Sequence, residues 1–319
     1  MLAISVVICS AGVRGMLTST LESVLAQNPL PAGGMEVVVV DNSQGNSDYV
    51  RRLTTDMADG ARMPLRYVHE PVRGLGFARN TGITAAEGEV IAFVDDDAVV
   101  DPTWVVELLR VYEETDAAVV GGRVDPIWEG ERPSWLGEEL YGYLSLLNYG
   151  TERTRCTFPN YPFGVNISFH RRALEAVGNF STSLGGGGAP TYLMDEIDLC
   201  QRIERAGYQI MYTPTARVGH LVPRSRQTRS YFLRRAIVLG RSTARMGWSP
   251  SGRAVALLQS AKGEALAAIR ATRHAGRALL HLAGRRERAF LSESRHVIWN
   301  ASWMWETGVL ALKGNARRA

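Results

Sequence analysis

Short apolar segments and amphipathic segments alternate along the first part of the chain. Residues 4–9 and 36–41 are nearly continuous β-branched runs, and between them residues 17–27 repeat leucine and valine at helical spacing. A short continuous apolar run is typical of a strand buried on both faces, whereas a period near 3.6 residues indicates an amphipathic helix. The pattern therefore predicts a strand, a helix and a second strand.

The same alternation continues to about residue 120. Helical periodicity predicts further helices at residues 76–86 and 104–114, and apolar runs predict strands at residues 65–69, 89–94 and 117–120. We expect Gly88 to close the first of these helices and Asp101, which precedes Pro102, to cap the second. Strands that alternate with helices predict an α/β fold with a mostly parallel central sheet flanked by helices.

The chain changes character after residue 120. Residues 125–163 are rich in tryptophan, tyrosine and proline, which suggests a pocket wall or lid, although ordinary core packing explains such aromatics equally well. Residues 194–206 have helical spacing and end at Gly207. A strand at residues 208–212 is expected to end before Pro214.

Composition limits the class of protein. The chain has 319 residues, of which 45% are hydrophobic and 21% charged, a balance that excludes disordered and fibrous proteins. The apolar opening lacks the basic start and long apolar stretch of a secretion signal, and no run of about 18 apolar residues predicts a membrane span. We therefore expect a cytoplasmic protein, in solution or peripheral at the inner face of the membrane.

Charge is distributed unevenly. Residues 1–223 contain 17 basic and 28 acidic residues, whereas residues 224–319 contain 19 basic and 4 acidic ones. This basic tail has no nucleic-acid recognition motif, so nucleic acid is not an expected partner. Contact with an anionic membrane surface is one interpretation, and an arginine-rich face packed on the body or on another subunit is the other. The tail is expected to form amphipathic helices, one with an apolar stripe at Val255, Leu258, Leu266 and Ile269.

Polar side chains follow the predicted strands where each strand ends. They are Ser10, Asp41, Asn42 and the run Asp95, Asp96 and Asp97. Ligands of such sheets bind beyond the carboxyl ends of the strands, so these groups are expected to converge on one site. Successive carboxylates repel one another unless a cation or hydrogen bonds compensate them, and extended backbone points Asp95 and Asp97 to the same side. Hard oxygen ligands favour Mg²⁺ or Mn²⁺, and an acidic loop that caps the next helix is the alternative.

A second acidic group begins a predicted helix. Asp195, Glu196 and Asp198 follow four successive glycines at residues 185–188. The glycines leave room for a bulky substrate and favour a functional site. Carboxylates in a first helical turn also stabilise a helix by themselves, which is the purely structural interpretation.

Three basic side chains are further candidates. Arg73 and Arg79 are expected to form a positive surface for a phosphate or diphosphate, with ordinary solvated arginines as the alternative. A single histidine is more often structural than a ligand, so His220 becomes a candidate metal ligand only because the acidic groups accompany it.

Taken in order, these motifs resemble those of the inverting family 2 glycosyltransferases of the GT-A fold. The resemblance spans residues 1–225 and rests on the segments Val6-Val-Ile-Cys-Ser10, Val39-Val-Asp-Asn-Ser43, Arg73-Gly-Leu-Gly-Phe-Ala-Arg-Asn80, Phe93-Val-Asp-Asp-Asp-Ala98, Gly164-Val-Asn-Ile-Ser-Phe-His-Arg-Arg172, Val177-Gly-Asn-Phe180, Asp195-Glu-Ile-Asp-Leu-Cys-Gln-Arg202 and Ala206-Gly-Tyr208. It implies a GT-A catalytic domain at 1–225, with nucleotide-sugar binding in about 1–120 and the acceptor side and base in about 121–225. A basic, mainly helical region would follow at 226–319.

The resemblance also implies roles for individual residues. Asp41 would recognise the nucleotide base, Arg79 would help hold the base or diphosphate, and Asp95 would contact the ribose side of the nucleotide. Asp97 would coordinate the metal, and His220 resembles a late histidine that completes the metal site in some relatives. Ser10, Arg73 and Asp96 are the remaining expected donor contacts.

By position, the resemblance makes Glu196 the catalytic base. The family commonly has Glu-Asp where this chain has Asp195-Glu196, so Asp195 is a rival and Asp198 stays open. The expected activity moves a sugar, with inversion, from a UDP-, dTDP- or GDP-linked donor to a hydroxyl of a saccharide, lipid-linked saccharide or natural product, with Mn²⁺ or Mg²⁺. The alternative is a noncatalytic nucleotide-sugar-binding or scaffold protein, and an oligomer is compatible with either.

Overall fold

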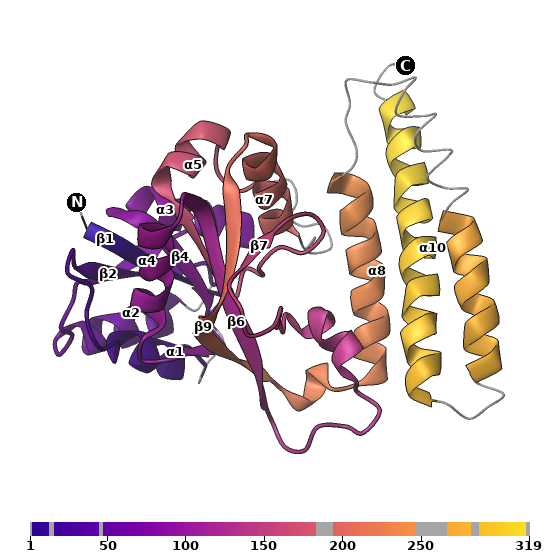
Figure 1. Cartoon of the computed structure of the whole chain (residues 1–319), viewed down its shortest axis with the longest axis horizontal. Coiled ribbons are helices and arrows are strands. Elements are labelled where there is room, and N and C mark those ends of the chain that lie inside the picture. Colours follow the sequence, from indigo (N-terminus) through magenta and orange to yellow (C-terminus); the bar gives the residue numbers. More distant parts are fainter. Residues whose placement is uncertain are drawn as a thin grey trace. The chain divides into compact units, whose positions relative to one another are not determined.

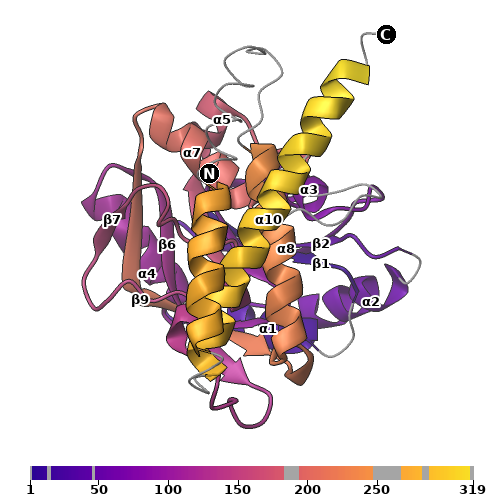
Figure 2. The ribbon, with the colours of Figure 1, turned by 90° about the vertical axis from the view of Figure 1, so that its right-hand side faces the viewer.

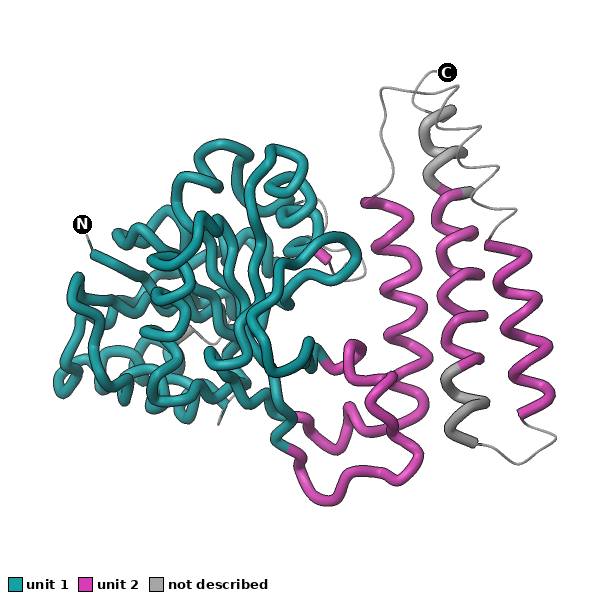
Figure 3. Tube along the Cα trace, in the orientation of Figure 1, with its two compact units in different colours: residues 1–127, 145–188, 195–221 teal, residues 128–144, 189–194, 222–319 magenta. Residues whose placement is uncertain are grey.

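The computed structural model describes residues 2–12, 16–44, 47–182, 194–246, 267–281 and 287–316. The chain forms two compact units (Figure 3). The first contains residues 1–127, 145–188 and 195–221, and the second contains residues 128–144, 189–194 and 222–319. The domain boundary at residue 225 stays a prediction, and the second unit includes part of the aromatic segment 125–163.

Four parallel strands form the amino-terminal half of the sheet in the first unit. They lie in the order β3-β2-β1-β4, and their bounds are Leu2–Ser10 for β1, Met35–Asp41 for β2, Leu65–His69 for β3 and Gly88–Asp95 for β4. The apolar runs account for these strands, because residues such as Val7, Val38 and Ile91 are fully buried. The predicted strands are confirmed to within two residues at either end.

Helices connect these strands. They are α1 at Met16–Leu25, α2 at Ser47–Ala58 and α3 at Leu75–Ala85. The strand order reverses between β3 and β4, and crossovers between parallel strands are right-handed, so α1 and α2 cover one face of the sheet and α3 the other (Figure 1). Gly88 begins β4 instead of closing α3, whose C-cap residue is Ala86. Glycine is needed at residue 88, since a Cβ there would lie 2.5 Å from the backbone nitrogen of Ser5.

Antiparallel strands complete the sheet. Its full order is β3-β2-β1-β4-β8-β6-β9-β5, with β7 beside β9, and the new strands are β5 (Ala98–Val100), β6 (Ala117–Trp128), β7 (Thr154–Cys156), β8 (Asn166–His170) and β9 (Gln209–Val222). Strand β8 runs antiparallel to both β4 and β6, and β9 runs antiparallel to both β5 and β7. The sheet is therefore mixed, and the predicted parallel arrangement holds for its first four strands.

Two details of this half differ from prediction. Helix α4 spans Trp104–Glu114 as expected, but Thr103 rather than Asp101 is its N-cap residue, and no side chain caps it by a hydrogen bond. Strand β9 continues past Pro214. On the edge of β9 that pairs with β7 and β5, the proline lies between the two paired stretches, which end at Tyr212 and begin at Val218, so it interrupts neither ladder.

The remaining helices of the first unit flank the same sheet. Helix α5 spans Arg171–Val177 and α7 spans Asp195–Arg205. Helix α7 ends before Gly207, whose φ of 90° suits glycine, as predicted. The aromatic segment is divided between the units: the 3₁₀ helix η1 at Glu138–Leu144 belongs to the second unit, and Tyr161 of the first unit is fully buried. Core packing thus accounts for this tyrosine.

The second unit is mainly helical, as predicted for the tail. It contains η2 (Arg224–Arg226), α8 (Arg229–Met246), a helix at residues 267–281 and α10 (Glu287–Ala316), and α8 packs along α10 (Figures 1 and 2). Close approach requires Gly240, since a Cβ there would lie 2.4 Å from the carbonyl oxygen of Trp299. Buried Glu306 accepts hydrogen bonds from Arg241 at 2.8 Å and Arg245 at 2.7 Å.

The apolar stripe predicted for the tail and the search for a membrane-spanning helix can be assessed only for the described residues. Of the predicted apolar stripe, Val255, Leu258 and Leu266 lie outside the described residues, whereas Ile269 is 66% exposed and so does not pack in the unit. Within the described ranges, each helix is either too short or too polar to cross a bilayer.

Candidate active site

The candidate site begins where the strand order reverses. Strand β1 lies between β2 and β4, so the chain has a topological switch point at the carboxyl ends of β1 and β4, where ligands of α/β sheets bind. The register aligns Ser10 with Asp41 and Cys9 with Asp95. The prediction that these strand ends lie side by side is therefore confirmed for the backbone.

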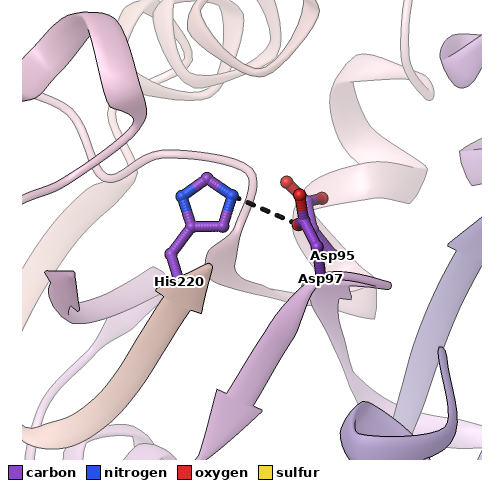
Figure 4. A group of neighbouring side chains, drawn as sticks. All are labelled: Asp95, Asp97 and His220. Atoms are coloured by element: carbon purple, nitrogen blue, oxygen red, sulfur yellow. Dashed lines mark ion pairs between the residues drawn. The ribbon is translucent and has the colours of Figure 1, made fainter. Parts of the chain in front are cut away.

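A group suited to a metal ion lies at this edge. One ligand atom each from Asp95, Asp97 and His220 lies within 4.8 Å of the others, and Nε2 of His220 is 3.1 Å from an Oδ1 of Asp97 (Figure 4). Antiparallel pairing builds the group, because β5 places Ala98 opposite His220 and the carbonyl of Asp97 accepts a hydrogen bond from the Leu221 amide. His220 thus lies within β9, because β9 continues past the predicted end of the strand at residue 212.

The donor set fits a small divalent cation. Ligands about 2.1 Å from an octahedral ion lie roughly 3–4 Å from one another, close to the spacing of this group. Carboxylate oxygens suit both Mg²⁺ and Mn²⁺. Asp97 and His220 are 9% and 3% exposed, so their side chains are held in place by the surrounding fold.

The middle aspartate has a different partner. Ser10 Oγ donates a 2.6 Å hydrogen bond to Asp96 and accepts one from the Gly12 amide at 3.1 Å. Burial raises the pKa of Asp96 to about 6; the hydrogen bond from Ser10 opposes this shift, and the charges of Asp97 and Asp95 add to it. The prediction that Asp95 and Asp97 face the same site is right. The backbone is not extended throughout, however, because residues 96–97 form a turn between β4 and β5.

Asp41 and its neighbour organise the adjoining loop. Asp41 is fully buried and accepts hydrogen bonds of 2.9 Å from the Ser43 amide and from the Tyr67 hydroxyl. Asn42 accepts from the Gly74 amide at 2.8 Å and donates to the carbonyls of residues 70 and 72. These bonds fix the loop that presents Arg73, whose side chain is exposed. Tyr67 was not among the predicted site residues, because nothing in a strand sequence tells which face a tyrosine occupies.

Arg79 lies inside the protein and not on a positive surface. Its residue is 3% exposed, and one guanidinium nitrogen is 2.9 Å from Asp195 and 3.6 Å from Glu196. The other terminal nitrogen is 4.0 Å from Asp95. Burial disfavours the charged guanidinium, but the charges of these three carboxylates outweigh it and raise the pKa of Arg79. The prediction that Arg73 and Arg79 together form a positive surface is therefore wrong for Arg79.

The two carboxylates that begin α7 differ in environment. Asp195 is 3% exposed and forms the ion pair with Arg79, whereas the side chain of Glu196 is 17% exposed. Burial and then the charge of Asp195 raise the pKa of Glu196 to about 7, while Arg79 opposes the shift. Asp198 pairs with Arg202 at 3.0 Å within the same helix. The four glycines at residues 185–188, which are predicted to leave room for a substrate, lie outside the described residues.

Two further residues support this arrangement and were not predicted as site residues. A Cβ at Gly164 would lie 2.1 Å from Nη2 of Arg79, so glycine is needed there. Asn80 exchanges two 3.0 Å hydrogen bonds with the backbone of Phe180, whose ring lies 5.1 Å from the Arg79 guanidinium carbon. Both residues occur in the quoted motifs, but only the three-dimensional fold shows what they contact.

The sequence is similar to known glycosyltransferases. Residues 5–178 match the profile of Glycosyl transferase family 2. A glucosyl-dolichyl phosphate glucuronosyltransferase of Haloferax volcanii is 33% identical over 225 residues, which cover 68% of this chain and 68% of the relative. The succinoglycan biosynthesis protein ExoM of Rhizobium meliloti is 28% identical over 235 residues, which cover 73% of this chain and 72% of the relative.

The fold is similar to that of a solved glycosyltransferase. PcManGT, a mannosyltransferase from Pyrobaculum calidifontis in complex with GDP-Man and Mn²⁺, aligns with a TM-score of 0.61 and 21% identity, covering 95% of this chain and 86% of that one. This likeness confirms the predicted GT-A fold. The profile match and the identity to the Haloferax relative show that the chain belongs to glycosyl transferase family 2 and is a glycosyltransferase.

Proposed function

We propose that this glycosyltransferase moves a sugar, with inversion, from a nucleotide diphosphate sugar to an acceptor hydroxyl. One observation carries the proposal. Arg79 lies 4.0 Å from Asp95, a member of the group suited to a metal ion, and 2.9 Å from Asp195, the neighbour of the candidate base. A cation site and a proton acceptor are thereby linked at one sheet edge. An inverting transfer needs both, one for the departing diphosphate and one for the attacking hydroxyl.

Asp97 and His220, with Asp95 beside them, would hold the divalent cation. When bound, the cation neutralises the negative charge that develops on the leaving diphosphate. We favour Mn²⁺ over Mg²⁺, because Mg²⁺ prefers oxygen ligands whereas imidazole nitrogen suits transition metals. The presence of Mn²⁺ in the PcManGT complex is consistent with this choice.

The donor is proposed to lie across the ends of β1, β2 and β4. Asp41 would accept a hydrogen bond from the nucleotide base once its side chain, which is fully buried against Ser43 and Tyr67, is uncovered. Ser10, Asp95 and Asp96 would line the ribose and diphosphate side. Exposed Arg73 lies on the loop held by Asn42 and can reach a diphosphate without desolvation of a buried charge. A UDP-, dTDP- or GDP-linked sugar meets these requirements.

Glu196 is the proposed general base. Its side chain is more accessible than that of Asp195, and its pKa near 7 lies close to the optimum for a base that works at neutral pH. Asp195 engages the Arg79 guanidinium at 2.9 Å, so its lone pairs are less available to an acceptor hydroxyl. Asp198 pairs with Arg202 instead, which argues against it as the base.

The acceptor is proposed to be a lipid-linked saccharide. The Haloferax relative is named for a glucosyl-dolichyl phosphate acceptor, and the second unit has a surface suited to an anionic membrane. On the helix at residues 267–281, Ile269 and Leu280 are 66% and 73% exposed. They lie within about 20° of each other around the helix, and exposed Arg273 and Arg277 follow within about 80°. An apolar strip flanked by arginine is typical of helices that lie in a membrane interface.

A direct assay tests the transferase proposal. UDP-, dTDP- and GDP-sugars are incubated with Mn²⁺ and candidate acceptors, and free nucleotide diphosphate is measured. Glu196→Gln should retain donor binding and lose roughly 10²–10⁴-fold in turnover, because the hydroxyl no longer has a proton acceptor. Asp195→Asn serves as the matched comparison. If Glu196→Gln turned over normally while Asp195→Asn did not, the base would be Asp195.

A further inference from the structure

Arg79 has the contacts of an internal counter-ion. Within the described part of the chain, its charged neighbours are the carboxylates of Asp95, Asp195 and Glu196, and its side chain is 4% exposed. The guanidinium carbon lies 6.0 Å from the ring centre of Phe93 and 5.1 Å from that of Phe180. Aromatic rings and carboxylates therefore surround the group, and its closest partner is Asp195.

Gly164 is the second part of this arrangement. A Cβ at residue 164 would lie 2.1 Å from Nη2, 2.9 Å from Cζ and 3.2 Å from Nη1 of Arg79. A side chain at 164 would therefore push the whole guanidinium out of place. The planar fork of arginine can reach two sites at once, which the single ammonium group of lysine cannot do.

These contacts bear on Glu196 through its neighbour. Asp195 and Glu196 are consecutive at the start of α7, so a fixed Asp195 also fixes the backbone that carries Glu196. Among the residues that the structure describes, the charged groups that face Glu196 are Asp195 and Arg79, and Cys200 lies one turn further along the same helix. Loss of the guanidinium would leave Asp195 buried beside Glu196 without its counter-charge.

We propose that Arg79 is a positioning residue that holds Asp195 in an ion pair, seated against Gly164, so that Glu196 is presented to the acceptor as the base. In this proposal Arg79 does not contact the donor, which departs from the role in base or diphosphate binding that the family resemblance implies. The proposal rests on the transferase function above and adds the mechanism that sets which of the two carboxylates acts.

Three substitutions test the proposal in the full-length chain. Arg79→Lys keeps the charge and loses the two-site fork, Arg79→Gln loses both, and Gly164→Ala displaces the guanidinium without changing it. We expect kcat to fall at least tenfold in all three, while the Kd for UDP or GDP with Mn²⁺, measured by calorimetry, changes less than threefold. In Arg79→Gln the acidic limb of the kcat–pH profile should move to higher pH, because the positive charge that stabilises ionised Glu196 is gone; in Arg79→Lys it should stay in place.

Two control variants separate positioning from stability. Gly60→Ala adds a Cβ where no atom lies within 4 Å and should leave kcat unchanged. Arg66→Lys alters a different ion pair, between Arg66, which is 36% exposed, and buried Glu36, and is expected to lower the melting temperature while kcat and its pH profile stay as in the wild type. A variant of Arg79 that behaved like Arg66→Lys would show a purely structural role.

Each remaining outcome decides the proposal. A tenfold or greater loss of nucleotide diphosphate affinity in Arg79→Lys, with kcat retained, would make Arg79 a donor ligand and overturn it. Normal kcat and pH profile in Gly164→Ala would also overturn it. Failure of the transferase function is distinguishable, because wild-type protein would then release no nucleotide diphosphate from any sugar nucleotide in the same assay.

Discussion

At the scale of single residues, the start of α7 combines two carboxylates with one guanidinium. Asp195, Glu196 and Arg79 share a mostly buried site in which there is more negative than positive charge. Such an excess is unfavourable for folding and is typical of functional sites. Glu196 is the carboxylate whose ionised form is disfavoured, as its raised pKa shows.

The first prediction concerns the pH dependence of activity. Because burial and Asp195 raise the pKa of Glu196 to about 7, the base is mostly protonated below that pH and cannot accept the hydroxyl proton. We expect kcat/KM to fall tenfold for each pH unit below about 6, with an apparent pKa near 7 for the free enzyme. Initial rates in matched buffers at constant ionic strength measure this profile. A limb with an apparent pKa near the ordinary glutamate value would contradict the assignment.

The second prediction concerns stability at the same residue. A carboxyl whose pKa is raised on folding binds more protons in the folded than in the unfolded state, so its ionisation destabilises the fold as pH rises from about 4.5 to about 7. Glu196→Gln removes that cost, and we expect the variant to gain roughly 1–3 kcal/mol relative to the wild type at pH 8 and little at pH 4.5. Calorimetric melting at both pH values measures the difference. A variant less stable than the wild type at pH 8 would exclude this account.

At this scale, the separation of two residues along the chain decides whether their contact can be predicted from the sequence. The aspartates at residues 95–97 could be recognised because they follow a buried strand directly. Arg79 was assigned to a surface because an arginine is exposed by default, and its partner Asp195 lies 116 positions further on. No local pattern encodes that pairing, so the burial of Arg79 and the need for Gly164 emerge only from the folded structure.

At the scale of elements, β2 and β9 show what apolar periodicity can and cannot predict. The fully buried β2 has an unbroken apolar run, whereas β9 mixes buried and partly exposed positions over Gln209–Val222 and contains Pro214. Apolar periodicity therefore found only the start of β9. Its length matters for function, because its far end carries His220 to Asp97.

The third prediction tests the buried hydrogen bond between Trp104 and Asn166, which joins α4 to the sheet. Asn166 in β8 is fully buried; it accepts a hydrogen bond from the Trp104 indole at 2.9 Å and donates to the carbonyls of Arg123 and Ala216. Trp104→Phe should cost about 2–4 kcal/mol, of which roughly 1–3 kcal/mol comes from the unpaired acceptor and the rest from the cavity. Urea denaturation measures the free energy of unfolding.

A matched variant separates the two contributions. Phe169→Leu in the same strand shrinks a fully buried ring that makes aromatic contacts with Phe93 and Phe180, and it leaves Asn166 fully paired. Its expected cost is about 1–2 kcal/mol. If Trp104→Phe were no more destabilising than Phe169→Leu, the hydrogen bond to Asn166 would not contribute to holding α4.

At the scale of the whole molecule, charge is separated between an acidic body and a basic tail. Residues 224–319 contain 19 basic and 4 acidic residues, and Glu306, one of these four, is buried in an ion pair with Arg241 and Arg245. Most of the basic charge is therefore not neutralised within the tail. The segregation was visible in the sequence, whereas which helix exposes both charge and apolar side chains required the structure.

The fourth prediction is that the second unit binds anionic membranes through the helix at residues 267–281. Vesicles of phosphatidylcholine with phosphatidylglycerol should bind the full-length protein more tightly than phosphatidylcholine alone. An arginine near an anionic surface contributes about 1 kcal/mol, so replacing Arg270, Arg273 and Arg277 by glutamine should weaken binding roughly 100-fold. Raising the ionic strength from about 0.1 M to about 1 M should weaken wild-type binding in the same direction, since the screening length falls from about 10 Å to about 3 Å.

The apolar strip gives an independent test of the same surface. Replacing Ile269 and Leu280 by serine removes apolar area and keeps every charge, so binding should weaken while its dependence on salt persists. Phe158→Ser, which alters a 53% exposed apolar residue of the first unit, is the matched control and should bind as the wild type does. Equal binding of all variants would exclude this helix as the membrane surface. Salt sensitivity that survives the arginine substitutions unchanged would place the basic contact elsewhere in the chain.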